Sequence, residues 1–206
     1  GDQQRGMIEP VPGAVEDRQN HVFVGPAGRV LDEAFAAAGI DRSTVFLTNA
    51  VKHFKYTLRG KRRIHDKPTR YEVRACRPWL DAELALVEPE LLVVLGATAA
   101  QAILGTKFRV TRSRGVVFAS PYARQTIATV HPASVLRAPD EATRKLGREM
   151  FFADIALASS LQVLRPRQES PLGPATRDAW TNEKLAEEFD DLLAWRDTVY
   201  AKHRSS

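Results

Sequence analysis

The chain has 206 residues, of which 44% are hydrophobic and 27% charged, and it carries a formal net charge of +5 with a pI near 9.6. This length suits one substantial α/β domain, and no apolar run approaches the roughly 18–20 residues that cross a bilayer. An internal disulfide is excluded because the sequence has one cysteine, and the N-terminus lacks the basic-then-apolar layout of a signal peptide. We therefore expect a cytoplasmic protein.

Hydrophobic periodicity predicts helices and strands that alternate along the chain. Strands that alternate with helices predict an α/β fold with three αβα layers around a mostly parallel central sheet. The expected elements are a loop over 1–22, a helix over 29–38, a strand over 45–49, an irregular basic stretch over 52–68, a helix over 69–87, a strand over 91–95, a short helix ending near 104, strands over 116–119 and 126–130, and a helix over 142–163.

The domain is expected to cover residues 1–165, followed by a polar linker over 166–180 that contains Pro171, Gly173 and Pro174. Residues 181–206 have helical spacing of apolar side chains, with Leu185 and Phe189 on one face. We interpret this segment as a C-terminal helical appendage that docks on the domain or on a partner.

Positive charge is concentrated in one part of the sequence. Residues 52–77 contain ten basic residues and two acidic ones, whereas residues 167–206 are slightly acidic. A concentrated basic segment is typical of contacts with phosphate groups, although a solvated basic face without a ligand has the same pattern.

Two polar residues stand at the ends of predicted strands, Asn49 and His131. In open parallel sheets, ligands bind beyond the carboxyl ends of the strands. The two side chains are therefore expected to share a site. The alternatives are a turn-forming asparagine and a structural histidine before Pro132.

Six sequence segments, in this order, resemble the UdgX type of uracil-DNA glycosylase, which is similar to the iron–sulfur uracil-DNA glycosylases. The resemblance covers roughly residues 14–163, and its most specific part is the KRRIH loop. The segments are EDRQNHVFVGPAGR (16–29), TNAVKHFK (48–55), GKRRIH (60–65), ACRPWL (75–80), LGATAAQAILG (95–105) and ATVHPASVLR (128–137).

The resemblance implies an enzyme that draws uracil out of DNA and cleaves its N-glycosidic bond. By this resemblance, Phe23 stacks on uracil, Asn49 reads its polar edge, and His131 donates to its O2 atom. A donor placed at developing negative charge lowers the barrier to bond cleavage. Asp17 resembles an acidic residue of the family's water-activation motif. Phe23 could instead be a core aromatic residue.

His65 resembles the histidine that attacks the sugar in UdgX and remains attached to it. A neutral imidazole is an adequate nucleophile near neutral pH. Arg63 resembles a residue that positions this loop, and Lys61 and Arg62 would contact phosphate groups of DNA. The alternative is a basic DNA-contact loop without covalent chemistry.

His53 and Cys76 match two of the four ligand positions of the family's [4Fe–4S] cluster. The alternative is a buried, inert cysteine beside a surface histidine. The chain has no Cys-x-x-Cys pair to supply the other two ligands. The family's first strand and most of its GEQPGD motif, including one acidic residue, are also expected to be missing before Gly1, so that the domain would be incomplete at its N-terminus.

The resulting prediction is a monomeric enzyme that removes uracil from DNA, preferably single-stranded, with no membrane partner. Two alternatives stay open: a conventional glycosylase that does not trap the sugar, and an inactive DNA-binding remnant. A phosphate-binding protein built on residues 25–28 is a weaker fourth hypothesis, because the lysine of a P-loop is absent there.

Overall fold

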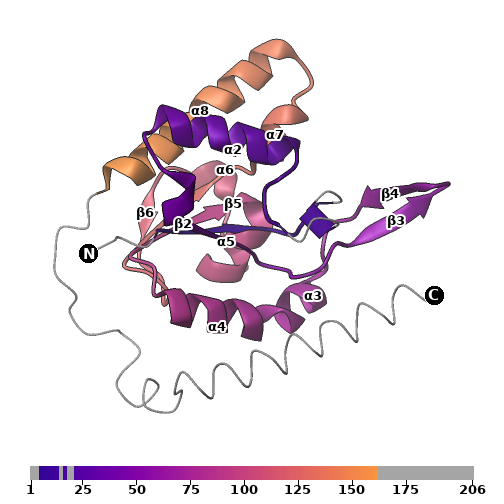
Figure 1. Ribbon diagram of the computed structural model, residues 1–206, viewed down its shortest axis with the longest axis horizontal. Helices are drawn as coiled ribbons and strands as arrows, with labels where there is room; N and C mark the ends of the chain where they lie inside the picture. Colours follow the sequence, from indigo (N-terminus) through magenta and orange to yellow (C-terminus); the bar gives the residue numbers. More distant parts are fainter. Residues whose placement is uncertain (1–4, 14–15, 18–20, 162–206) are drawn as a thin grey trace. The chain divides into compact units, whose positions relative to one another are not determined.

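A computed structural model describes residues 5–13, 16–17 and 21–161 of the chain. Its centre is a five-stranded sheet in the order β2-β1-β5-β7-β6, in which all neighbours are parallel except β6 and β7 (Figure 1). This arrangement confirms the expected α/β class. The strands are β1 (Arg5–Glu9), β2 (Val45–Asn49), β5 (Leu91–Leu95), β6 (Val117–Phe118) and β7 (Gln125–Thr129).

Strand β1 occupies the interior of the sheet, between β2 and β5. The prediction of a loop over 1–22, and of a sheet without its first strand, is therefore wrong at residues 5–9. The segment has little strand signature of its own, because it contains a glycine and two charged residues. Hydrogen bonding to strands on both sides, together with burial of Met7 and Ile8, determines its conformation.

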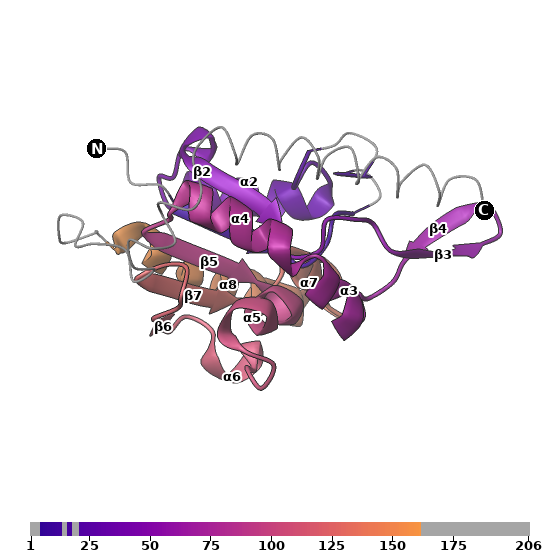
Figure 2. The ribbon, with the colours of Figure 1, turned by 90° about the horizontal axis from the view of Figure 1, so that it is seen from below.

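Helices cover both faces of the sheet (Figures 1 and 2). On one face, Leu31 and Phe35 of α2 and Phe151 and Ile155 of α8 pack with strand residues such as Val93. On the other face, α4 and α5 bury apolar side chains against the opposite sides of the same strands. The helices of the two layers are α2 (Pro26–Ala37), α7 (Pro132–Leu136) and α8 (Glu141–Ser160), and α4 (Arg77–Val87) and α5 (Gly96–Leu104).

The basic stretch between β2 and α4 is more ordered than expected. Residues 52–68 were predicted to be irregular, but they contain β3 (Tyr56–Arg59) and β4 (Arg62–His65), an antiparallel hairpin that turns at Gly60. Gly60 has φ +60°, a conformation that a hairpin turn requires and glycine adopts readily. We call residues 56–65 the hairpin arm.

The helix predicted over 69–87 is divided into α3 (Arg70–Ala75) and α4. Its start is confirmed, because Thr69 and Glu72 form a reciprocal capping box. The helix restarts at Arg77 because Pro78 lacks the amide that would continue the hydrogen-bond ladder.

The strands predicted near 45, 91 and 126 and the helices near 29, 96 and 142 are confirmed, whereas the strand expected over 116–119 is limited to Val117–Phe118. Three short elements were not predicted: η1 (Arg42–Thr44), α6 (Val110–Ser113) and α7. Among the described residues, no helix is long and apolar enough to cross a membrane. The predicted linker (166–180) and C-terminal helix (181–206) lie outside the described residues.

Candidate active site at the carboxyl edge of the sheet

Three polar side chains meet at the carboxyl edge of the sheet. Glu9 ends β1 and lies opposite Asn49, the last residue of β2, while His131 follows the end of β7 by two residues. Glu9 Oε1, Asn49 Oδ1 and His131 Nε2 are all buried and have no hydrogen-bond partner among the described residues. Because an unpaired buried polar group costs about 1–3 kcal/mol, three of them together indicate a binding site. We call these residues the sheet-edge cluster.

The tautomer of His131 follows from the helix that it caps. Its Nδ1 accepts a hydrogen bond from the backbone N–H of Ala133 at 3.1 Å, so Nδ1 carries no proton. Burial, with smaller contributions from Arg137 and His65 when they are positively charged, lowers the pKa of His131 to about 4. The ring is therefore neutral at pH 7, with its one proton on Nε2. His131 thus presents an unused N–H donor in the sheet-edge cluster.

Glu9 is 3% exposed, and burial raises the pKa of its carboxyl to about 9, with a smaller contribution from the negative charge of Glu16. Glu9 Oε2 lies 3.6 Å from His131 Nε2. Since Glu9 is protonated and His131 neutral at pH 7, this contact is not an ion pair. Glu9 therefore adds a neutral carboxyl group, which can donate as well as accept, beside the histidine donor.

Phe23 reaches the same edge through a strained loop. Its φ of +57° is rare for a residue other than glycine, and its carbonyl packs so closely on Gly28 that a side chain there would meet the oxygen at 1.8 Å. The Phe23 ring stacks on the His131 ring with centroids 6.0 Å apart. Phe23 is also only 2% exposed and belongs to the core. The structure thus places Phe23 beside the sheet-edge cluster, within an apolar wall.

A close approach of backbone explains a second glycine at this edge. Gly96 follows β5 directly, and its φ of +80° favours glycine. A side chain at Gly96 would meet Cβ of His131 at 3.1 Å. The turn between β5 and α5 therefore leaves room for the histidine.

The hairpin arm holds His65 through a stack of aromatic and cationic groups. The guanidinium of Arg63 lies 5.1 Å from the ring centre of Tyr56 and 5.4 Å from that of Phe54. Arg63 also forms an ion pair with Asp17 at 3.0 Å. The ring of His65 lies 5.8 Å from that of Phe54. Asp17 and Arg63, both predicted as site residues, are thus in direct contact.

His65 is charge-coupled to the sheet-edge cluster. Burial lowers the pKa of His65, the positive charge of Arg137 lowers it further, and Asp66 partly opposes this shift. Arg137 acts in the same way on His131, and His65 itself lowers the pKa of His131. The shared influence of Arg137, and the effect of His65 on His131, place the two imidazoles in one electrostatic neighbourhood. His65 is thus predominantly neutral at pH 7, the form that acts as a nucleophile.

Comparison with known sequences identifies the family. The sequence model described as the uracil DNA glycosylase superfamily matches residues 10–155, more than half of the chain. The chain belongs to this superfamily. Its members are DNA glycosylases, enzymes that cleave N-glycosyl bonds.

Curated relatives support the assignment. The chain is similar to the type-4 uracil-DNA glycosylase of Pyrobaculum aerophilum, with 34% identity over 65% of this chain and 68% of the relative. The protein of the same name from Thermotoga maritima is 33% identical over 66% of this chain and 67% of its own length. That from Sulfurisphaera tokodaii is 32% identical over 70% of this chain and 66% of its own length. The chain thus spans about two thirds of these relatives.

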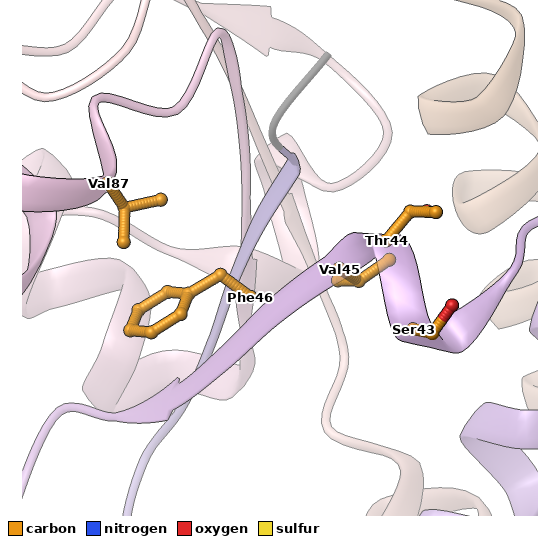
Figure 3. Close-up of a pocket in the computed structure, with 5 residues that line it drawn as sticks. All are labelled: Ser43, Thr44, Val45, Phe46 and Val87. Carbon is orange, nitrogen blue, oxygen red and sulfur yellow. The ribbon is translucent and has the colours of Figure 1, made fainter. Parts of the chain in front are cut away.

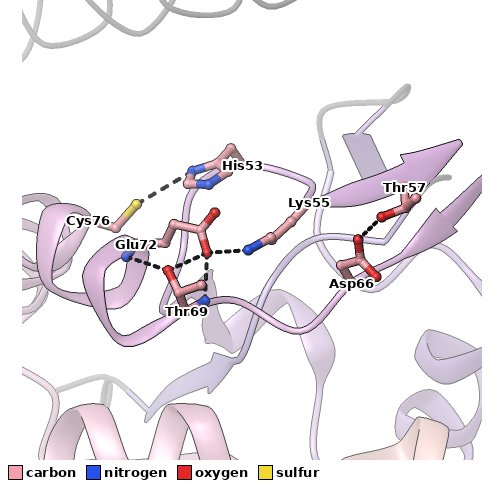
Figure 4. Close-up of polar contacts among 7 residues, drawn as sticks. All are labelled: His53, Lys55, Thr57, Asp66, Thr69, Glu72 and Cys76. Carbon is pink, nitrogen blue, oxygen red and sulfur yellow. Dashed lines mark hydrogen bonds and ion pairs between the residues drawn. The ribbon is translucent and has the colours of Figure 1, made fainter.

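The two residues predicted to bind the [4Fe–4S] cluster, His53 and Cys76, are neighbours (Figure 4). Cys76 Sγ lies 3.7 Å from His53 Nδ1, and the backbone N–H of Lys52 points to the same sulfur at 3.5 Å. A [4Fe–4S] cluster needs four ligands. Within the described ranges, no group of three or more His, Cys, Asp or Glu residues could hold a metal ion. These residues alone therefore do not fit a [4Fe–4S] cluster.

The predicted DNA contacts lie at the tip of the hairpin arm. Lys61 is exposed beside Gly60, while the side chain of Arg62 is outside the described part of the structure. Figure 4 shows that the base of the arm is braced by Asp66, which contacts Thr57, and by Lys55, which pairs with Glu72 at 2.9 Å.

A cavity of about 300 Å³ lies elsewhere, at the start of β2 (Figure 3). It is lined by Ser43, Thr44, Val45, Phe46 and Val87. It contains none of the predicted site residues, and Asn49 lies at the other end of the same strand. The cavity is therefore separate from the sheet-edge cluster.

Sequence reasoning missed Glu9 and the aromatic pair Phe54 and Tyr56. The sequence did hold a signal for Glu9, because an acidic residue directly follows the apolar pair Met7-Ile8 and precedes a proline-rich turn. Phe54 and Tyr56 are two residues apart, a spacing that does not by itself indicate a functional role. Their contact with Arg63 can be recognised only when the register of the hairpin is known.

Proposed function

We propose that the chain excises uracil from DNA and that His65 captures the sugar covalently. The observation that carries the proposal is the set of unpartnered polar atoms in the sheet-edge cluster. The N–H of His131 matches the O2 acceptor of uracil, and the amide of Asn49 can accept from N3–H and donate to O4. Cytosine presents an acceptor at N3 and a donor at its neighbour, which reverses the pattern that Asn49 reads.

In the proposed reaction, the lone pair of a neutral His65 nitrogen attacks C1′ of the deoxyribose as the C1′–N1 bond breaks. The bonding electron pair leaves with uracil, and His131 stabilises the negative charge that develops on O2. Attack gives an imidazolium attached to the sugar. Its remaining N–H proton passes to the departing uracil anion, directly or by way of solvent, which leaves a neutral base and a neutral adduct.

The states of the nearby carboxyl groups favour His65 over water as the nucleophile. Glu9 is held in its protonated form by burial, so it is a poor base at pH 7. The carboxylate of Glu16 accepts from the backbone N–H of Gly25 at 2.8 Å, and that of Asp17 is paired with Arg63. None of the three is a ready base for activating water, whereas the neutral imidazole of His65 needs no base before it attacks.

The test is a denaturing gel with a single-stranded oligonucleotide that contains one uracil. The expected result is a slowly migrating protein–DNA adduct that disappears in His65→Ser and persists in His21→Ser, a change at another exposed histidine. An oligonucleotide with thymine in place of uracil should yield no adduct. Uracil release without an adduct would overturn covalent capture, and the absence of both uracil release and an adduct would overturn the proposed activity itself.

The basic hairpin arm supports DNA as the partner, and we propose single-stranded DNA as the preferred form because an unpaired uracil costs less to extrude. The monomeric state, the UdgX type and the cytoplasmic location stay predictions.

A further inference from the structure

The backbone carbonyl of Asn49 points to the open edge of the sheet. β2 is the outermost strand on its side of the described sheet, and its neighbour is β1. The backbone N–H of Ala50 donates to the carbonyl of Glu9, on β1, at 2.7 Å. The carbonyl of Asn49 belongs to the same trans peptide group as this N–H, so it points in the opposite direction, away from β1. No strand of the described sheet can therefore pair with it.

Lys52 supplies a partner for this carbonyl. Its ammonium group donates to Asn49 O at 2.8 Å and to Thr48 Oγ1 at 2.9 Å. It also forms an ion pair with Glu83 of α4 at 2.5 Å, and the hydroxyl of Thr48 donates to the same carboxylate at 2.5 Å. A lysine ammonium has three N–H donors, which match these three oxygen atoms in number. We call Thr48, Lys52 and Glu83 the lysine clamp.

The lysine clamp is fixed by more than its own contacts. The side chains of Lys52 and Glu83 are 19% and 21% exposed, so solvent screens their ion pair only in part. The backbone N–H of Lys52 points to Cys76 Sγ at 3.5 Å. Glu83 belongs to α4, which buries Leu80 and Leu84 in the core on its face of the sheet. The clamp therefore joins the end of an edge strand to a packed helix.

The side chain of Asn49 depends on this backbone for its direction. Asn49 Oδ1 is buried and has no hydrogen-bond partner among the described residues, so no such bond holds it before a base arrives. In the proposed reaction the amide accepts from N3–H of uracil and donates to O4, whereas an amide turned over would match cytosine. Displacements of about 1 Å can cost about 10²-fold in rate. Recognition of uracil therefore requires a fixed main chain at Asn49.

We propose that Lys52 is a positioning residue for uracil recognition, which acts through the backbone carbonyl of Asn49 and is itself held by Glu83. This inference rests on the proposed function, to which it adds a residue that determines specificity. In this role Lys52 contacts Asn49 and not the base. Loss of Lys52 should therefore weaken recognition of uracil, and it should have little effect once the amide of Asn49 has been removed.

The test is a double-mutant cycle with the full chain, on single-stranded DNA that contains one uracil. Lys52→Met keeps the length of the side chain but removes its charge and donors, and it should lower the single-turnover rate of uracil release about tenfold. In an Asn49→Ala background, the same change should alter the rate less than about twofold, because the group that Lys52 positions is absent. A general structural role would lower the rate by the same factor in both backgrounds.

Glu83→Gln tests the lysine clamp from its other end. It keeps an acceptor for Lys52 but removes the negative charge, so the rate should fall by about threefold, again only where Asn49 is present. If Lys52→Met does not fold, Glu83→Gln takes its place in the cycle. Arg148→Met is the matched control, because it also removes a cation that pairs with a glutamate of another helix, Glu33 on α2. It should leave the rate unchanged.

Binding gives a measurement that does not depend on bond cleavage. The wild-type chain should bind single-stranded DNA with 2′-fluoro-deoxyuridine more tightly than the same strand with 2′-fluoro-deoxycytidine. Lys52→Met should reduce this preference about threefold or more, and Arg148→Met should retain it. An equal effect of Lys52→Met in both backgrounds, or an unchanged rate and base preference in Lys52→Met, would overturn the inference. A wild-type chain that releases no uracil would instead overturn the proposed function.

Discussion

The sheet-edge cluster and the hairpin arm are built in opposite ways. Glu9, Asn49 and His131 are fixed by parallel strands, buried, and left without hydrogen-bond partners. The arm is an isolated pair of strands, exposed along β3, and its base is held by an ion pair and aromatic contacts. A rigid, desolvated cluster suits recognition of a planar base, because orienting its dipoles costs nothing at the moment of reaction. A projecting arm suits contact with a sugar and a phosphate chain outside the protein.

The comparison predicts that a change in the sheet-edge cluster lowers both uracil release and adduct formation. His131→Ala removes the donor at uracil O2 and should lower uracil release and adduct formation together by about 10²–10³-fold, as expected for one such donor. Rapid-quench measurements of both products on single-stranded DNA would check this. His131→Ala also removes the cap of α7, so His131→Asn, which can cap a helix, is the companion variant. Undiminished uracil release in both variants would contradict the assigned role.

The buried carboxyl group of Glu9 in the sheet-edge cluster predicts an unusual dependence of stability on pH. The pKa of Glu9 is about 9 in the folded chain, against 4.5 for a free carboxyl, so the unfolded chain loses this proton first as pH rises. The free energy of unfolding should therefore decrease with increasing pH between about 4.5 and 9. The lowered pKa of His131 acts in the opposite direction only below about 6.5.

Urea unfolding at pH 6.5 and pH 8 isolates the Glu9 contribution. The wild-type chain should lose roughly 2 kcal/mol over this interval, and Glu9→Gln, which is neutral throughout, should lose much less. Glu72→Gln is the control: the hydrogen bonds of Glu72 to Thr69 and its pairing with Lys55 outweigh burial and lower its pKa to about 2, so this variant should keep the wild-type slope. Equal slopes in wild type and Glu9→Gln would show that Glu9 is ionised in the folded chain.

The arm predicts a selective and smaller effect. Arg63→Gln removes the charge that pairs with Asp17 and lies over Phe54 and Tyr56, so His65 should be less well positioned. Adduct formation should fall about tenfold, while binding of uracil-containing DNA should change less than threefold. Arg63→Lys should restore part of the adduct rate, because it keeps the charge but not the planar stacking. Single-turnover rates and equilibrium binding separate the two quantities. If the rate of adduct formation and the affinity for DNA fell equally, Arg63 would contact DNA without positioning His65.

Much of the fold could be predicted from local patterns. The buried strand 91–95, the capping box at Thr69 and the histidine after the strand near 126 are each specified by adjacent residues, and each is confirmed. Strand β1 and the hairpin were missed because their stability depends on partners distant in sequence or on register. A strand with a glycine and a charged residue at each end is stable only between β2 and β5.

The sequence by itself determined which chemical groups are available: an asparagine and a histidine after strands, a histidine in a basic loop, and one cysteine. Only the tertiary structure decided their states. Parallel pairing brings Glu9 beside Asn49 and buries its carboxyl, so that it keeps its proton at pH 7. The cap of α7 fixes the proton of His131 on Nε2, and the hairpin register places Tyr56 opposite His65. Protonation and orientation depend on desolvation and on neighbours brought together by folding, which no local pattern of residues contains.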